Sequence, residues 1–255
     1  MVKPKKHLGQ HFLKDEVIAR KIADCVTAKS NDIVLEVGPG MGVLSKYLAQ
    51  KFNDNFYLSE VDSESITYLN AHYAFNERLL NRDFLKIDFN LQWPNRAIVV
   101  CGNFPYNISS QIVFKAIDNC SIVTQLSGMF QKEVAKRICS SPNSKEYGML
   151  SVLSQALYEC KYQFTVNEGA FNPPPKVKSG VIVMQKRTIS RISVDFKLFK
   201  GLVKASFATR RKTLRNCLKM YNFETNLEIE NLLQKRAEQL EVEQFDFLAK
   251  HIVHG

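Results

Sequence analysis

The stretch DIVLEVGPGMGVLSKYLAQKF, residues 32–52, carries the strongest pattern in the sequence. Its first seven residues form an apolar run that predicts a buried strand, and the apolar spacing over 41–52 predicts an amphipathic helix. Glycines at 38, 40 and 42 separate the two. A strand, a glycine turn and a helix in this order are typical of a doubly wound α/β fold, in which the turn lets the backbone approach a ligand. Because position 43 is Val, the third glycine of the dinucleotide fingerprint is absent.

Strand-like and helix-like stretches alternate outward from this turn, from about residue 17 to 185. Further strands are predicted at 55–62, 78–88, 97–104 and 121–131, and helices at 63–75, 111–119 and 132–139, with Ser63 as the N-cap of the first. Alternation of this kind predicts a parallel sheet with helices on both faces. The overall prediction is an α/β, Rossmann-like sheet.

The pattern changes after residue 160. Two strands, 161–166 and 179–186, follow without a helix between them, which predicts an antiparallel hairpin at the sheet edge. From about 190 the chain is helical and charged, with helices predicted in 196–207, 227–240 and 242–252. We therefore divide the chain into an α/β domain, 1–189, and a small all-helical domain, 190–255.

Composition narrows the class of protein. With 255 residues and 45% hydrophobic residues the chain can bury a large core, and it contains neither a membrane-span-length apolar run nor an N-terminal signal core. We expect a cytoplasmic protein. Six scattered cysteines without a Cys-x-x-Cys pair, and histidines without ligand spacing, argue against zinc and disulfides. We expect no metal.

Net charge indicates a polyanionic partner. Lys and Arg number 35 against 25 Asp and Glu, a net charge of +10. Basic clusters in such a protein favour nucleic-acid binding over mere solubility, although a solvated helix face is the alternative for the run at 208–216. The candidate RNA-binding residues are Lys5, Lys6, Lys176, Lys178, Arg210, Arg211, Lys212 and Arg215.

Two acidic residues at successive predicted strand ends indicate a nucleoside cofactor. Glu60, twenty-two residues after Gly38, can accept hydrogen bonds from ribose hydroxyls, and Asp83 can accept one from an adenine amino group. We expect Glu60 at an exposed strand end. No Lys-Ser/Thr pair follows the glycines, which argues against a nucleoside triphosphate. S-adenosyl-L-methionine fits better than NAD.

The segment NFPY, residues 103–106, follows a strand at the same sheet edge. Its composition is also that of an ordinary turn. Next to a methyl donor, however, Asn103 and a carbonyl of the Phe104–Pro105 segment can hold an adenine amino group, so that positioning carries the reaction. Tyr106 can stack on an unstacked base. We expect the ring to matter and the hydroxyl to be dispensable.

Motifs along nearly the whole chain resemble the small-subunit ribosomal RNA adenine N6,N6-dimethyltransferases, the KsgA family. They are LGQHFL (8–13), EVGPGMG (36–42), Glu60, RDFLK (82–86), NFPYNIS (103–109), FQKEVAKRI (130–138), YGMLSV (147–152), FNPPPKVKSGV (171–181) and RRKTLRN (210–216). The family has Asn more often than His at position 11.

The resemblance implies roles for individual residues. The LGQHFL segment closes over the cofactor through His11 and Leu13, and the contact at His11 is made either by its side chain or by its backbone. The turn around Gly38 and Gly40 lies near the methionine portion, and Phe171 packs on the adenine opposite Tyr106. It also implies two adjacent adenosines in a hairpin near the RNA's 3′ end and a role in subunit maturation. We further expect RNA binding by 190–255 and a monomer.

Two rival hypotheses remain. A macrolide-resistance type large-subunit methyltransferase shares the glycine turn and the NFPY-like pocket, but LGQHFL together with RRKTLRN argues against it. A non-catalytic assembly, transcription or RNA-binding factor could keep the same fold. The complete set of Gly38, Glu60, Asp83, Asn103 and Tyr106 disfavours that hypothesis, because a binding protein needs no methyl-transfer pocket.

Overall fold

The computed structural model describes residues 2–5, 8–209 and 211–253. Its contacts divide the chain into two compact units. The first comprises Met1–Ala135 and Lys161–Lys186, and the second Lys136–Cys160 and Arg187–Gly255. Residues 136–160 therefore group with the C-terminal helices, which the sequence did not suggest. The predicted domain boundary at 189/190 stays a prediction.

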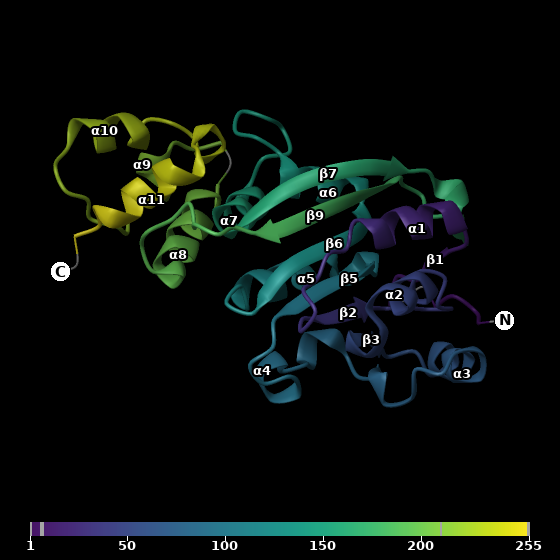
Figure 1. The fold of residues 1–255 in the computed structure, drawn as a ribbon. Helices are drawn as coiled ribbons and strands as arrows, with labels where there is room; N and C mark the ends of the chain where they lie inside the picture. Colours follow the sequence, from purple (N-terminus) through teal and green to yellow (C-terminus); the bar gives the residue numbers. More distant parts are fainter. Residues whose placement is uncertain (1, 6–7, 210, 254–255) are drawn as a thin grey trace. The chain divides into compact units, whose positions relative to one another are not determined.

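A seven-stranded sheet forms the centre of the α/β region (Figure 1). Its order is β4(Leu79–Asn81), β3(Phe56–Glu60), β2(Ile33–Val37), β5(Ile98–Asn103), β6(Val123–Gln131), β9(Ser179–Lys186) and β7(Tyr158–Val166). Strands β4 to β6 in this order are parallel, and β9 runs antiparallel to β6. The order reverses between β2 and β5, the switch point at which open α/β sheets bind ligands.

Apolar side chains project from the strands of this sheet and are buried by the helices that flank it. Val34, Leu58 and Val99 share one core cluster with residues of helices α1(Glu16–Asp24), α2(Ser45–Phe52) and α3(Ser63–His72). Helix α5(Ser109–Asp118) packs on β6 with its own buried stripe. The predicted Rossmann-like fold, with helices flanking a central sheet, is confirmed, as is the hairpin of β7 and β9 at the sheet edge.

Two local predictions were wrong, and a carboxylate explains each. The strand predicted over 78–88 ends at Asn81, because Asp83 Oδ1 accepts a hydrogen bond from Leu85 N (2.9 Å) and caps the 3-10 turn Phe84–Lys86. The N-cap of α3 is Asp62 rather than Ser63, since the Asp62 side chain accepts from Glu64 N.

The second unit is helical. It contains α7(Met149–Leu157), α8(Phe196–Ser206), α9(Leu214–Cys217), α10(Leu227–Leu233) and α11(Val242–Lys250), and α8 packs against α7 and α11. Helices were predicted at α8, α10 and α11, but the helix predicted over 227–240 ends at Leu233 and is followed by a 3-10 turn, Ala237–Gln239. Helix α7 was missed because it is buried on most sides and lacks a polar face. Within the described residues, no helix has the length and apolar character needed to cross a membrane.

Candidate active site

A cavity of about 360 Å³ opens in the first unit where the strands β2, β3 and β5 end. Its volume is in the range of small-molecule sites. The lining comes from segments 8–13, 36–44, 60–61, 83–85 and 103–108. Five stretches that are distant in sequence thus meet at the switch point, and most of the predicted site residues lie there.

The glycine turn forms one wall, and it is packed too tightly for side chains. Gly40 has φ +56°, and a Cβ placed on it would lie 2.8 Å from the ring of Phe12. Phe12 belongs to β1(Phe12–Leu13), which pairs with β8(Phe171–Asn172). Leu13 is buried beside it and lines the cavity. The N-terminal segment therefore lies directly on the turn.

Glu60 is buried, contrary to the expected exposed strand end. The residue is 5% exposed, and its carboxylate accepts hydrogen bonds from the backbone N–H groups of Gly40 (3.2 Å), Val61 (2.8 Å) and Asp62 (2.9 Å). Burial raises its pKa, an effect that these three bonds partly offset. The Glu60 carboxylate, which we predicted to bind the ribose, therefore links the end of β3 to the glycine turn.

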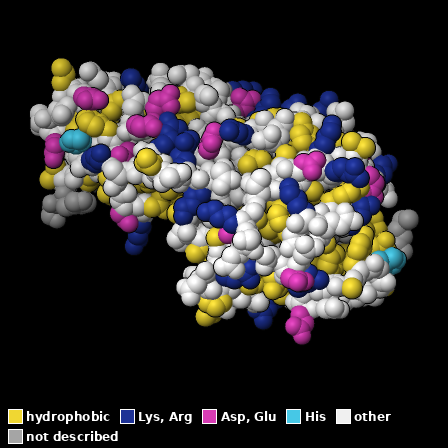
Figure 2. Space-filling model, viewed as in Figure 1, with side chains coloured by type: hydrophobic (Ala, Val, Ile, Leu, Met, Phe, Trp, Pro, Cys, Tyr) yellow, Lys and Arg dark blue, Asp and Glu magenta, His cyan; other side chains and the backbone are white. Residues whose placement is uncertain are grey.

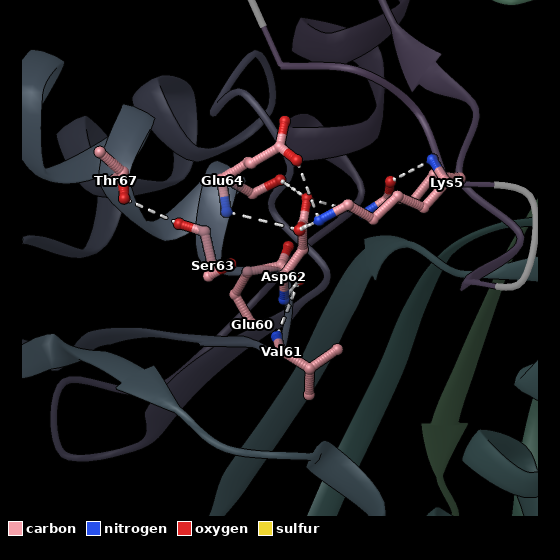
Figure 3. Close-up of polar contacts among 9 residues, drawn as sticks. Lys5, Glu60, Val61, Asp62, Ser63, Glu64 and Thr67 are labelled. Atoms are coloured by element: carbon pink, nitrogen blue, oxygen red, sulfur yellow. Dashed lines mark hydrogen bonds and ion pairs between the residues drawn. The ribbon is translucent and has the colours of Figure 1, made fainter.

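Lys5 lies in an ion-pair cluster beside Glu60, which argues against its predicted RNA contact (Figure 3). Its Nζ pairs with Asp62 Oδ1 and lies 3.3 Å from Glu64 Oε1. The bond to Asp62 raises the pKa of Lys5, while the Asp62 side chain is fully buried and also accepts from Ser65 Oγ (2.9 Å). The charge of Lys5 is therefore neutralised within the protein, and the contact fastens the N-terminal segment to α3.

Asp83 lines the cavity, and the turn that follows it is hydrogen-bonded to the side chain of Lys115. Lys115 Nζ donates to the carbonyls of Leu85 (2.9 Å) and Ile87 (2.6 Å) and lies 4.8 Å from the ring centroid of Phe89. Burial lowers the pKa of Lys115, and the nearby Asp83 acts in the opposite direction. Lys115 was not among the predicted residues, because nothing near it in sequence indicates these partners.

The NFPY segment brings Asn103 and Tyr106 to the opposite wall. Asn103 Nδ2 donates to the His11 carbonyl (2.9 Å), so the remaining polar atom of this side chain, Oδ1, is an acceptor. The Tyr106 hydroxyl and Ser179 Oγ are 2.5 Å apart, and the His11 ring lies 5.4 Å from the Tyr106 ring. His11 Nδ1 is 3.0 Å from the Pro173 carbonyl.

Phe104 and Phe171 are core residues here. Phe104 is 1% exposed and its ring centroid lies 4.6 Å from that of Phe130. Phe171 is also 1% exposed, belongs to the cluster beneath β1 and is not part of the cavity lining. The structure does not bring Phe171 to the ring face of Tyr106, so its stacking role stays a prediction that requires movement. Pro105 touches the turn, 3.3 Å from a Cβ placed on Gly38.

Comparisons with known proteins agree with this geometry. Residues 1–252 match the model of a family described as ribosomal RNA adenine dimethylase. The chain belongs to this family. The match confirms the resemblance and the predicted enzyme class, a methyltransferase that acts on adenine in ribosomal RNA.

Individual relatives cover almost the full length. The chain is 51% identical to the ribosomal RNA small subunit methyltransferase A of Flavobacterium johnsoniae over 98% of this chain and 96% of that protein. Identity to the protein of that name in Bacteroides thetaiotaomicron is 48%, over 99% and 95%.

Solved structures share the fold. A dimethyladenosine transferase from Plasmodium falciparum has a TM-score of 0.77 at 26% identity, covering 95% of this chain and 99% of that one. The 23S rRNA methyltransferase ErmE has a TM-score of 0.71 over 94% and 98%, but at 23% identity it shows the likeness of fold alone.

One cavity residue of this dimethylase received no predicted role, although it is the first residue of the motif EVGPGMG. Glu36 is the last residue but one of the buried strand β2, is 1% exposed and lines the cavity, and within the described residues its Oε2 has no hydrogen-bond partner. Burial raises its pKa to about 8, and the carboxylate of Glu60 acts in the same direction. A single acidic residue inside the apolar run IVLEV was the available signal.

The remaining basic candidates are solvent-exposed. Lys176, Lys178, Arg211 and Lys212 are exposed, and Arg215 is exposed but paired with Glu230. Lys6 and Arg210 lie outside the described residues. In Figure 2, Lys and Arg side chains occur at many places on the face in view, with Asp and Glu among them. Net charge alone therefore does not define a binding patch.

Metal ligation has no support in the described parts of the chain. Among residues 2–5, 8–209 and 211–253, no group of three His, Cys, Asp or Glu side chains is arranged to hold a metal ion.

Proposed function

We propose that this chain transfers methyl groups from S-adenosyl-L-methionine to the N6 amino groups of two adjacent adenosines in small-subunit ribosomal RNA. The observation that carries the proposal is the joint position of Glu60, Asp83, Asn103 and Tyr106 around one cavity. The names of the relatives that are about half identical support the small subunit as the substrate. The hairpin near the 3′ end and the role in subunit maturation follow from the family resemblance.

The residues present fit an adenosine-containing cofactor. Glu60 retains one acceptor position for a ribose hydroxyl beside its three backbone bonds: each carboxylate oxygen has two lone pairs, Oε1 accepts from Val61 and Asp62, and Oε2 accepts only from Gly40. Asp83 uses Oδ1 for the turn and offers Oδ2 to an adenine amino group. Val61 and Leu85 add apolar walls between them. When bound, S-adenosyl-L-methionine supplies the electrophilic methyl group of a sulfonium.

The NFPY segment, in the opposite wall of the cavity, positions the target amine. Asn103 Oδ1 can accept one hydrogen bond from the target amino group. The Pro105 carbonyl already accepts from Ile108 N (3.3 Å) and Ser109 Oγ (3.2 Å), so the Phe104 carbonyl is the better second acceptor. Two such bonds keep the nitrogen lone pair out of the ring and aim it across the cavity, and Tyr106 stacks on the base.

RNA contact is assigned to the exposed basic residues. Lys176, Lys178, Arg211 and Lys212 are available to phosphates, Arg215 competes with its own ion pair, and Lys5 is left out. We further propose that the protein acts as a monomer on RNA within a pre-assembled small subunit in the cytoplasm.

The test is identification of the product. Purified protein is incubated with S-adenosyl-L-methionine and with small- or large-subunit particles from cells that lack the enzyme, and digested RNA is analysed by mass spectrometry. N6,N6-dimethyladenosine in small-subunit RNA, absent with Asn103→Ala, supports the proposal. Product in the large-subunit RNA alone identifies the macrolide-resistance type activity, and binding without product in either identifies a non-catalytic factor.

A further inference from the structure

The hydroxyl of Tyr106 is bound to a side chain from a different part of the chain. Tyr106 and Ser179 are 73 residues apart in sequence, and their oxygens lie 2.5 Å apart. Burial raises the pKa of Tyr106, and the bond to Ser179 offsets this in part. A hydroxyl withdrawn from water loses more when its partner is removed than an exposed hydroxyl does.

Ser179 is a rigid anchor. It is fully buried and is the first residue of β9, where it lies opposite Gln131 of β6. The neighbouring backbone bond from Lys132 N to the Lys178 carbonyl (2.9 Å) fixes the start of the strand. A Cβ on the next residue, Gly180, would lie 2.8 Å from both the Tyr162 hydroxyl and the Ala135 Cβ, so the strand is closely packed here.

The ring of Tyr106 is also supported from the side. The His11 imidazole lies against it, with ring planes inclined by 36°, and is itself held next to the Pro173 carbonyl. A ring that is bonded at its hydroxyl end and flanked by an imidazole has one orientation rather than several. The N-terminal segment, the NFPY segment and the segment before β9 therefore converge on this side chain.

We propose that Ser179 is a positioning residue for capture of the target base: by binding the Tyr106 hydroxyl it fixes the plane of the ring on which the adenine stacks. Ser179 itself touches neither base nor methyl donor. The inference rests on the proposed function, and it replaces the expectation that the Tyr106 hydroxyl is dispensable. A stacking ring held in advance captures a base without first losing its own rotational freedom.

The test compares Tyr106→Phe, Ser179→Ala and the double variant. Single-turnover methylation at subsaturating RNA should fall about tenfold in each single variant, the factor expected for one net hydrogen bond. The double variant should be no slower than the slower single variant, because both changes remove the same bond. Multiplicative losses would overturn the inference.

A second readout follows the base itself. RNA carrying 2-aminopurine at the target position changes its fluorescence when the base leaves the helix and stacks on Tyr106. Tyr106→Phe and Ser179→Ala should reduce the amplitude at saturating RNA equally, with cofactor affinity unchanged. Full amplitude in Ser179→Ala would contradict the positioning role.

Ser127→Ala is the matched control. Ser127 lies on β6, is also fully buried, and its Oγ has no hydrogen-bond partner within the described residues. It should keep the wild-type rate and amplitude. If Ser179→Ala does not fold, Tyr106→Phe against wild type decides the matter, and wild-type behaviour of Tyr106→Phe overturns the inference. Wild-type protein that makes no product refutes the proposed function itself, whereas normal methylation with an uncoupled pair refutes only the role of Ser179.

Discussion

The candidate active site, together with the ion-pair cluster beside it, and the basic segment 211–216 both contain charged residues, but the surroundings of these residues differ. Glu60 in the cavity wall and Asp62 next to it are buried and accept several hydrogen bonds each, and Lys5 is paired with Asp62 and Glu64. In the basic segment, Arg211 and Lys212 are exposed to solvent. Lys5 and Arg211 look equivalent in the sequence, but Lys5 stabilises the protein through its ion pairs, whereas Arg211 is available to a binding partner.

This difference implies two kinds of response to substitution. Changes in the cavity should alter stability, cofactor binding or both, because each removed group leaves buried partners unpaired. Changes in the basic segment should alter RNA binding in a salt-dependent way and leave the cavity untouched. Four predictions test this contrast, beginning with the substitution that should change the free energy of unfolding or of binding most.

The largest effect is expected from Glu36→Gln as a function of pH. The pKa of Glu36 is about 8 in the folded protein, above its usual value near 4.5. Because the unfolded chain loses this proton first, the contribution of Glu36 to stability is complete below about pH 4.5 and is lost as pH rises to 8. That loss is on the order of 5 kcal/mol, because each unit of difference between the two pKa values is worth about 1.4 kcal/mol.

Urea unfolding from pH 5 to 9 measures it. Gln cannot ionise, so the variant should lack the fall in stability that wild type shows, and its advantage should reach a plateau above pH 8. Parallel curves for the two proteins would mean that Glu36 ionises normally, and the cavity would then be more open to water than its burial indicates.

Glu60→Gln should come next, with cofactor affinity reduced about ten- to a hundredfold, or roughly 1.5–3 kcal/mol, because a charged acceptor of hydroxyl donors is lost. Calorimetry with S-adenosyl-L-methionine measures the affinity, and RNA affinity serves as the internal control. Unchanged cofactor binding would remove Glu60 from the site. Since Glu60 also binds Gly40 and Asp62, a lower melting temperature is expected too.

Lys115→Met tests whether the hydrogen bonds of Lys115 to the turn after Asp83 are needed for cofactor binding. Loss of the two bonds to the Leu85 and Ile87 carbonyls should weaken cofactor binding severalfold and destabilise the fold by about 1 kcal/mol, a figure discounted for the partial exposure of Lys115. Lys115→Arg should restore most of the affinity. An effect on melting temperature without any effect on affinity would limit Lys115 to a structural role.

The smallest effect at physiological salt is expected from the double change Arg211→Ala and Lys212→Ala. Each phosphate contact contributes a slope of about −0.7 to −0.9 in log K against log salt, so the double variant should flatten the slope by about one to two units. Filter binding across a salt series measures it. Lys5→Met removes a positive charge as well, but it should leave the slope unchanged, because that charge is already neutralised by Asp62 and Glu64. Equal flattening in both variants would erase the contrast between the regions.

The parts of the fold predicted from sequence are those set by local patterns. The glycine turn, the strands around it and the helices at α8, α10 and α11 follow from apolar spacing and turn chemistry within about twenty residues. Helix α7 was missed because its burial is nearly complete. The strand after Arg78 was overestimated because Asp83 caps a turn.

The candidate site was predicted in part for the same reason. Residues carried by motifs, such as Glu60, Asp83 and Asn103, line one cavity. Pairings across the chain were not predictable: Lys5 meets Asp62 from 57 positions away, and Tyr106 meets Ser179 from 73. Phe171 is buried in the core cluster and lies opposite Leu13 in the pairing of β8 with β1, which its motif does not indicate. Sequence patterns thus identified which residues line the cavity, whereas their burial and their hydrogen-bond partners, which determine their roles, became known only from the structure.

Single-turnover methylation at saturating cofactor and saturating small-subunit substrate tests the central claim most directly, because it removes binding from the comparison. Asn103→Ala should be slower than wild type by at least about a hundredfold, the loss typical of a group that orients the reacting atoms. The variant with both Arg211→Ala and Lys212→Ala should react within about twofold of wild type. A near-wild-type rate for Asn103→Ala, or a large loss from the basic segment alone, would contradict the assignment of the chemistry to the cavity.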